Sequence, residues 1–352
     1  MLGAMGLMLA SCAEEEEPAR IVTEEGAISF RPALSRATET TNANLSVMYV
    51  TALEQGTESD YFSNLEFKKG TEGFFSSTPA YFWPGDDSPL TFYAYSPSMS
   101  ELGADVTIDG SKKVMENFSV PENIADQVDF ITATATGKKS VNEDAGVELT
   151  FSHQLSQIEI QAKSSNPAYT VKVAGARIGR AEYIGTFDFA TSTWTLDDWH
   201  DTAVYDVECD PVTLTENPVS VMGASGNAML LPQTLTPWSP KNDPDNVARE
   251  AYLSVLVNIT TTDGAQVYPF VTDTKLDANG NKRTYAWATT PLTATWEAGK
   301  KYIYTLDFTN GAGYVDPDDP TPGEPILGEP IKFTINVLPW VNTPGEISMQ
   351  TE

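Results

Sequence analysis

The stretch YLSVLVNITTTDGAQVYPFV, residues 252–271, shows most clearly the pattern that predicts the fold. Its two arms, residues 252–259 and 265–271, are rich in β-branched and aromatic side chains, which favour strands. Asp263-Gly264 lies between the arms, and both of these residues tolerate the positive φ angles of a tight hairpin turn. The stretch therefore predicts a β-hairpin.

Similar turn signals recur along the chain. Asp109-Gly110 and Asn279-Gly280 are further hairpin dipeptides, and residues 185–189 and 193–196 have the pattern of another pair of arms. No stretch of a dozen residues repeats apolar side chains strongly at the helical period, so we expect at most one short helix, near residues 121–128. Many short strands separated by turns are typical of β-sandwiches and barrels. We predict an all-β fold with little helix.

Length and charge narrow the class of protein. The 352 residues include 21 Lys and Arg against 49 Asp and Glu, a formal net charge of −28. Nucleic-acid binders need a basic face, so we expect no nucleic-acid partner. The 15 Phe, 14 Tyr and 7 Trp residues are too many for a disordered acidic chain. The length favours two domains, and no apolar run reaches the ~18 residues of a membrane-spanning helix.

The amino terminus has the pattern of an exported lipoprotein. Residues 2–10 are apolar and lead into Leu9-Ala10-Ser11-Cys12, which resembles the lipobox of bacterial lipoproteins. We therefore expect residues 1–12 to be a lipoprotein signal peptide, with a lipid on Cys12 that holds the precursor at the outer membrane. The acidic run at residues 14–17 resembles an export tag for the outer face. With Cys12 acylated, Cys209 has no partner for an intrachain disulfide.

Two stretches divide the remaining chain. The polar sequence GKKSVNEDAG, residues 137–146, predicts a boundary between an N-terminal β domain over residues 37–145 and a C-terminal one over residues 146–312. The proline-rich sequence of residues 313–330 predicts an extended, semi-rigid linker, because proline restricts φ and removes hydrogen-bond donors.

Both ends of the chain carry strand-like segments. After the linker, in the terminal segment 331–352, IKFTINV (residues 331–337) alternates apolar and polar side chains, which predicts a strand with one face to bury. Residues 27–30 form a shorter segment of similar pattern, within an acidic tether and amino-terminal segment spanning residues 13–36.

Four motifs in order resemble the signatures of fimbrillin-like proteins. They cover residues from about 30 to 340, with Gln157 standing where the family commonly has lysine, and they are YFWP with LTFYAYSP (residues 81–97), LTFSHQLSQI (149–158), LPQ (231–233) and WEAGKKYIY (296–304). The resemblance implies two tandem antiparallel β-sandwich domains of transthyretin-like topology. It also implies a structural subunit of a type V pilus, or of a pilus-like adhesin on the cell surface, whose partners are other pilus subunits.

The resemblance further implies how such subunits assemble. A trypsin-like protease would cut between Arg36 and Ala37, whereas Arg31 is a poor site because proline follows it. The cut would release Cys12 with its lipid and remove the first strand. A carboxy-terminal strand from the next subunit would then fill the opened groove.

The terminal strand has two possible positions. Its apolar side chains, Ile331, Phe333, Ile335 and Val337, could be donated to a neighbouring subunit by strand addition. Burial of each is worth ~1.5 to 3 kcal/mol, so such a junction could be long-lived. Alternatively, the segment folds back as the last strand of its own domain. The sequence leaves both readings open.

The sequence lacks a recognisable catalytic, cofactor or metal constellation. His153 shares strand parity with Leu149 and Phe151, which predicts a structural histidine in a core, and His200 lies in a polar turn. The loop at residues 277–281 is better read as a hairpin turn than as a calcium loop. We therefore predict a protein that is not an enzyme and that needs no metal or cofactor.

A second class of function stays open at this point. The chain could be a surface lipoprotein that binds carbohydrate without polymerising, with a host or glycan ligand as its partner. Trp199 and Trp238 lie in polar or proline-rich turns, where an indole could stack on a sugar. Trp83, Trp296 and Trp340 lie in or beside predicted strands and are expected in cores.

Overall fold

The computed structural model describes residues 25–34, 45–70, 73–197, 201–240, 249–277, 279–319 and 321–340, without the side chains of residues 33 and 34. Within these ranges the all-β prediction is confirmed. The helix expected near residues 121–128 is a single 3-10 turn, Ile124–Asp126. Two four-residue helices were not predicted, α1 (Met99–Leu102) and α2 (Lys139–Asn142). None of the helices in the described ranges is long and apolar enough to cross a bilayer.

The N-terminal half forms a closed barrel. The first strand closes it, because β1 pairs with β4 on one side and runs parallel to β9 on the other. The interior is aromatic, and Phe30, Phe67 and Phe92 are fully buried in it. In barrel order the strands are β1 (Phe30–Leu34), β4 (Phe75–Ser76), β3 (Asp60–Lys69), β2 (Val47–Glu54), β5 (Leu90–Ser96), β8 (Ile131–Gly137) and β9 (Val147–His153).

The predicted domain boundary is displaced. We expected the second domain to begin at residue 146, but β9 belongs to the barrel, where its inward side chains Val147, Leu149 and Phe151 are buried. The polar stretch 137–146 is the connection from β8 to β9 and contains α2. The chain therefore passes to the next body after His153. Local polarity marks a loop, and it does not show which sheet the following strand joins.

The C-terminal half is a sandwich of two sheets whose facing side chains share one apolar core. The first sheet contains β15 (Val219–Ser220), β10 (Ser156–Lys163), β22 (Lys300–Asp307) and β24 (Lys332–Pro339), with β16 (Ala228–Leu230) also on β10. The second follows the order β14 (Ala203–Thr213), β11 (Tyr169–Ala181), β18 (Glu250–Thr261), β17 (Thr234–Pro237) and β21 (Ala294–Thr295). It also contains β19 (Gln266–Tyr268), β20 (Ala286–Pro291) and β23 (Tyr314–Val315).

Three predicted hairpins are present. The turn at Asp263-Gly264 joins β18 to β19, although β18 makes most of its pairs with β11 and β20. Asp109-Gly110 lies in the turn from β6 (Asp105–Ile108) to β7 (Lys113–Ser119), and β12 (Ile184–Asp188) pairs with β13 (Thr193–Leu196).

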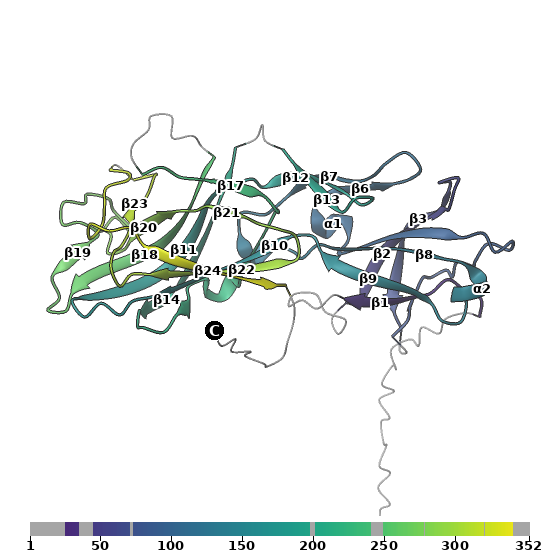
Figure 1. The fold of residues 1–352 in the computed structure, drawn as a ribbon, viewed down its shortest axis with the longest axis horizontal. Helices are drawn as coiled ribbons and strands as arrows, with labels where there is room; N and C mark the ends of the chain where they lie inside the picture. The colour runs from purple at the N-terminus through teal and green to yellow at the C-terminus, as the bar shows by residue number, and fades with distance from the viewer. Residues whose placement is uncertain are drawn as a thin grey trace, which may run out of the picture.

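The two halves are joined by a sheet that the sequence did not predict. The β6–β7 hairpin comes from the first half and the β12–β13 hairpin from the second, and β7 pairs with β12. Aromatic rings pack on this sheet, and the rings of Phe130 and Phe187 meet edge to face at 5.1 Å. Figure 1 shows the barrel and the sandwich at opposite ends of the long axis, with this four-stranded sheet between them.

The prediction of an extended, semi-rigid linker over residues 313–330 is wrong. Residues 311–319 and 321–330, here called the strap, are packed on the sandwich and do not form an extended spacer. Within the strap, β23 pairs with β20, and the side chains of Ala312, Val315 and Ile326 are buried. The apolar residues that lie among the prolines bind the segment to the sheet, which composition alone did not indicate.

Candidate functional site

The tail strand β24 lies at an open edge of the sandwich. It pairs antiparallel with β22 of its own chain, from Lys332 opposite Asp307 to Pro339 opposite Lys300. Among the described residues, β22 is its only strand partner. The segment 331–337 therefore lies in its parent sheet in this structure, in the position of the fold-back alternative (Figure 1).

The side chains of residues 331–340, here called the tail, are buried to different extents. Ile331 and Trp340, which flank β24, are 3% and 2% exposed, whereas Ile335 and Val337 are 41% and 49% exposed. Directly opposed residues of an antiparallel pair share a face, so Ile335 and Val337 lie on the same face as the buried Tyr304 and Tyr302. The tail thus presents apolar side chains on the core-facing side of a sheet edge that the rest of the sandwich does not fully cover.

The front strand β1 has the opposite environment. The ring of Phe30 meets those of Phe67 and Phe92 edge to face, at centroid distances of 4.8 and 5.1 Å. Ile28 is also buried, and its backbone N–H donates to the carbonyl oxygen of Tyr81 at 2.7 Å. This strand is sealed into the barrel core on both of its edges.

The carboxyl end of the tail is held at the junction of barrel and sandwich. Trp340 stacks on His153, the last residue of β9, with 4.4 Å between ring centroids and 25° between planes. His153 Nδ1 lies 2.8 Å from Oδ1 of Asp129, just before β8. The backbone N–H of Trp340 donates to the carbonyl oxygen of Gly299 at 2.8 Å. His153 and Asp129 belong to the barrel and Gly299 to the sandwich, so Trp340 contacts both bodies.

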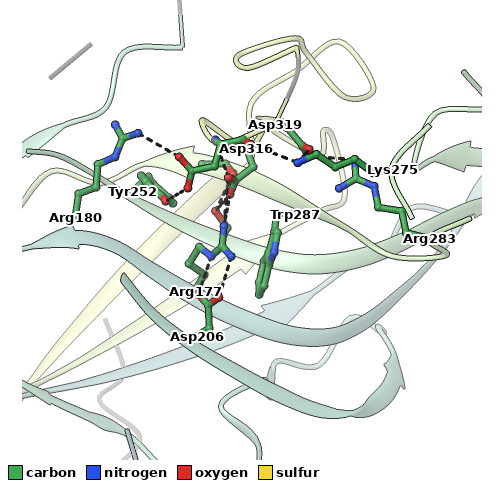
Figure 2. Close-up of polar contacts among 12 residues, drawn as sticks. Arg177, Arg180, Asp206, Tyr252, Lys275, Arg283, Trp287, Asp316 and Asp319 are labelled. Atoms are coloured by element: carbon green, nitrogen blue, oxygen red, sulfur yellow. Dashed lines mark hydrogen bonds and ion pairs between the residues drawn. The ribbon is translucent and has the colours of Figure 1, made fainter. Parts of the chain in front are cut away.

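The strap that precedes the tail is fixed by a partly buried ion-pair network (Figure 2). Arg177 on β11 donates to both carboxylate oxygens of Asp206 at 2.7 and 2.8 Å and to Asp316 of the strap at 3.2 and 3.3 Å. Its guanidinium also lies over the ring of Trp287, 4.3 Å from the centroid. Bidentate geometry and stacking are features that arginine provides and lysine does not.

The pKa values of Asp316 and Arg177 in this network are both raised. Burial raises the pKa of the Asp316 carboxyl, and the positive charge of Arg177 only partly offsets that shift. For Arg177 burial lowers the pKa, but hydrogen bonds to Asp206 and the charge of Asp316 outweigh it and raise the pKa. Oδ2 of Asp316, which Arg177 also contacts, accepts further hydrogen bonds from the hydroxyl groups of Ser254 and Thr289.

A second group of ion pairs fixes the far side of the strap. Asp319 is buried between Lys275 and Arg283, and Arg283 Nη2 lies 3.1 Å from its Oδ2. Arg283 also pairs with Asp273. Beyond these contacts, Leu327 and Gly328 have φ angles of +58° and +79°, and the chain turns there toward Ile331. The strap is therefore a fixed base, and the tail begins directly after it.

The residues predicted from sequence fall into two groups. Ile331, Phe333, Ile335 and Val337 lie together in or beside β24. Cys12, Arg36 and Ala37, together with Trp199 and His200, lie outside the described residues. Lipidation and processing therefore stay predictions.

The aromatic and histidine predictions have clearer outcomes. Trp83, Trp296 and Trp340 are buried, as expected, and so is His153. Trp238 is also buried, with its ring edge to face with those of Tyr252 and Tyr314, so it offers no surface for a sugar in this structure. Asp129 was missed, because its pairing with His153 joins positions 24 residues apart.

The expected turn at residues 277–281 is supported by the local hydrogen bonds. Asp277 Oδ1 accepts from the backbone N–H groups of Asn279 and Asn281, each at 2.9 Å. Within the described part of the chain, no group of three or more His, Cys, Asp or Glu side chains is placed to hold a metal ion.

Comparison with known proteins shows which family this chain resembles. The family model described as fimbrillin-like matches residues 35–340. The chain belongs to the fimbrillin-like family. The match begins after β1 and ends at Trp340, so it covers nearly the whole of both bodies of this fimbrillin-like chain.

Individual relatives agree with that assignment. Fimbrium subunit Fim1C of Phocaeicola vulgatus is 29% identical over 117 residues, which span 30% of this chain and 31% of that protein. A fimbrial protein from Bacteroides vulgatus has a similar fold, with a TM-score of 0.57 at 16% identity, over 89% of this chain and 99% of that one. A putative cell adhesion protein from Bacteroides ovatus aligns with a TM-score of 0.52 at 15% identity, over 91% and 99% of the two chains.

Proposed function

We propose that this fimbrillin-like chain is a structural subunit of a pilus or pilus-like adhesin on the cell surface. Its family membership supports the proposal. The names of its relatives, a fimbrium subunit, a fimbrial protein and a putative cell adhesion protein, point in the same direction. In this proposal the precursor is a lipoprotein held at the outer membrane through Cys12, and its partners are other pilus subunits.

Maturation in this scheme removes the front strand. β1 ends at Leu34, two residues before Arg36, so a cut between Arg36 and Ala37 would leave the whole strand on the released piece. The lipid on Cys12 would leave with it. The remaining chain would lose the strand that closes the barrel.

Loss of β1 would create an acceptor groove. It would bare the backbone edges of β4 and β9, and it would remove Phe30 from its position between Phe67 and Phe92. Unpaired strand edges beside exposed apolar side chains bind other strands readily. The next subunit would fill this groove with its tail.

The tail strand suits such a groove because it repeats the one-sided spacing of residues 27–30, the segment that leads into β1. Ile331, Phe333, Ile335 and Val337 are spaced two residues apart, as are Ile28 and Phe30. Transfer would bury the parts of Ile335 and Val337 that are still exposed in the parent sheet, 41% and 49%, at a gain of about half of the ~1.5 to 3 kcal/mol expected for burying a whole side chain. This contrast, between a sealed front strand and an incompletely covered tail strand, is the observation that carries the proposal.

Replacing the tail side chains tests the donor role. In this proposal the processed protein forms heat-resistant ladders on gels. Ile335→Asn with Val337→Asn should abolish these ladders, and deletion of residues 331–352 should leave monomers. The control exchanges polar residues on the opposite face of the strand, Thr334→Asn with Asn336→Thr, and should polymerise normally. Equal ladders from all of these variants would refute strand donation.

The processing site is tested separately. Arg36→Ala should keep the amino-terminal segment attached to secreted material, as read by intact mass. Arg31→Ala is the matched control and should mature normally, because proline follows Arg31. An unchanged mature mass for Arg36→Ala would place the cut elsewhere.

A further inference from the structure

Trp340 packs on His153 and Asp129, which together are here called its seat. This seat contains an uncommon group of buried polar atoms. His153 and Asp129 pair through one atom each, and Trp340 covers the imidazole. Three other atoms there, His153 Nε2, Asp129 Oδ2 and Trp340 Nε1, have no hydrogen-bond partner among the described residues. Buried polar atoms normally have partners, because they lose their hydration on burial. Seating Trp340 is therefore favoured by stacking and opposed by dehydration.

The side chains of the tail strand are covered unevenly. Ile335, Val337 and Leu338 are exposed and Phe333 is partly buried against Tyr304, so the fully buried side chains are Ile331 at one end and Trp340 at the other. Ile331 follows directly from the strap, which is held by its own ion pairs. Trp340 is therefore the anchor that has to leave its seat before the tail can swing away from β22.

The seat is also connected to the front strand. β1 pairs with β9 from Phe30 opposite Val147 to Leu34 opposite Phe151, and His153 lies two residues beyond this ladder. With β1 absent, β9 would keep only its pairing with β8, where His153 is opposite Ile131. The strand that carries the seat would then be less firmly held.

We propose that Trp340, stacked on the buried His153–Asp129 pair, is a latch that holds the tail in its parent subunit until β1 is removed. The proposal rests on the strand exchange described above and concerns its timing. The latch keeps the apolar tail docked in the precursor. Loss of β1 loosens β9, and the unsatisfied polar atoms of the seat gain water when the indole leaves.

Hydrogen exchange of the β24 amides in the full chain tests the latch, with Cys12→Ser removing the lipid acceptor. Trp340→Ala should speed their exchange at least tenfold while the β2 and β5 amides of the barrel stay unchanged. Trp340→Phe retains a ring that can stack and removes the orphaned N–H, and it should keep exchange slow. Val337→Ala, on the exposed part of the same strand, is the control and should change exchange less than threefold.

Coupling to the front strand is read from the same amides. In protein freed of residues 1–36, the β24 amides should exchange faster than in the uncleaved chain. Equal rates in the two forms would overturn the coupling through β9. Equal rates in Trp340→Ala and Val337→Ala would overturn the latch itself.

The ladder assay separates this inference from the proposed function. If Trp340→Ala frees the tail but no processed variant forms ladders, the latch stands and strand donation is wrong. If ladders form normally and Trp340→Ala exchanges like the Val337→Ala control, strand donation stands and the latch is wrong.

Discussion

The two end strands of this protein, β1 and β24, have opposite surroundings. β24 alternates apolar and polar side chains as far as Val337, and Ile28 and Phe30, at the start of the front segment, have the same spacing. Phe30 is enclosed by aromatic rings, whereas Ile335 and Val337 remain 41% and 49% exposed on the core-facing side of an incompletely covered sheet edge. β1 has a strand on each side, and β24 pairs with β22 alone among the described strands. The alternation therefore specifies a strand with one face to bury, and the number of neighbouring strands determines how much of that face is covered.

The difference in burial between β1 and β24 is tested most directly by truncating one buried and one exposed side chain. Phe30→Ala should lower the free energy of unfolding by about 3 to 5 kcal/mol, because it leaves a cavity in the barrel core. Val337→Ala should change it by less than about 0.5 kcal/mol. Urea titration followed by circular dichroism measures both, and similar losses would show that the two strands are equally buried in solution.

Two isoleucines of the tail allow the same test of burial within one segment. Ile331→Ala should cost about 2 to 4 kcal/mol, since Ile331 is buried beside the strap. Ile335→Ala makes the same chemical change at an exposed position and should cost less than about 1 kcal/mol. A larger loss for Ile335→Ala than for Ile331→Ala, measured in the same titration, would contradict attachment of the tail through its ends.

A smaller effect is expected at the base of the tail. Arg177→Lys keeps the positive charge and loses the bidentate hydrogen bonds to Asp206 and the stacking on Trp287. We expect a loss of about 1 to 2 kcal/mol, and faster proteolysis of the strap than in the parent protein. Lys172→Arg, an exposed change on the same strand, is the control. Unaltered cleavage in Arg177→Lys would show that the strap is held by other contacts.

The smallest effect concerns pH. Burial raises the pKa of Asp316 in the folded chain, so the folded state binds this proton more tightly than the unfolded state. The resulting stability is present below the unfolded pKa and is lost as pH rises through the raised folded pKa. Asp316→Asn cannot titrate, so the difference in unfolding free energy should move in favour of the parent protein as pH falls from 7 toward 4. Parallel pH profiles for the two proteins would contradict the shift.

Features that depend on neighbouring residues were predictable from the sequence. Asp263-Gly264 and Asp109-Gly110 both lie in turns, as predicted. Gly264 adopts the expected positive φ, +94°, whereas Gly110 does not and instead lies where a Cβ atom would come within 2.6 Å of the Glu58 carbonyl oxygen. The parity of His153 with Leu149 and Phe151 was enough to place it in a core, since strand side chains alternate between faces. The ordered motifs indicated the family, which the match over residues 35–340 shows.

Features that depend on contacts between residues far apart in the sequence could not be predicted from it. The strap looks like a linker until Arg177 and Arg283 are brought against Asp316 and Asp319 from other parts of the chain. Likewise β9 looks like the start of a new domain until β1 pairs with it from more than 100 residues away. Alternation and turn chemistry act over a few residues and fix where strands form. Which edge each strand occupies, and whether Trp340 meets His153, follows from the free energy of packing the assembled sheets together.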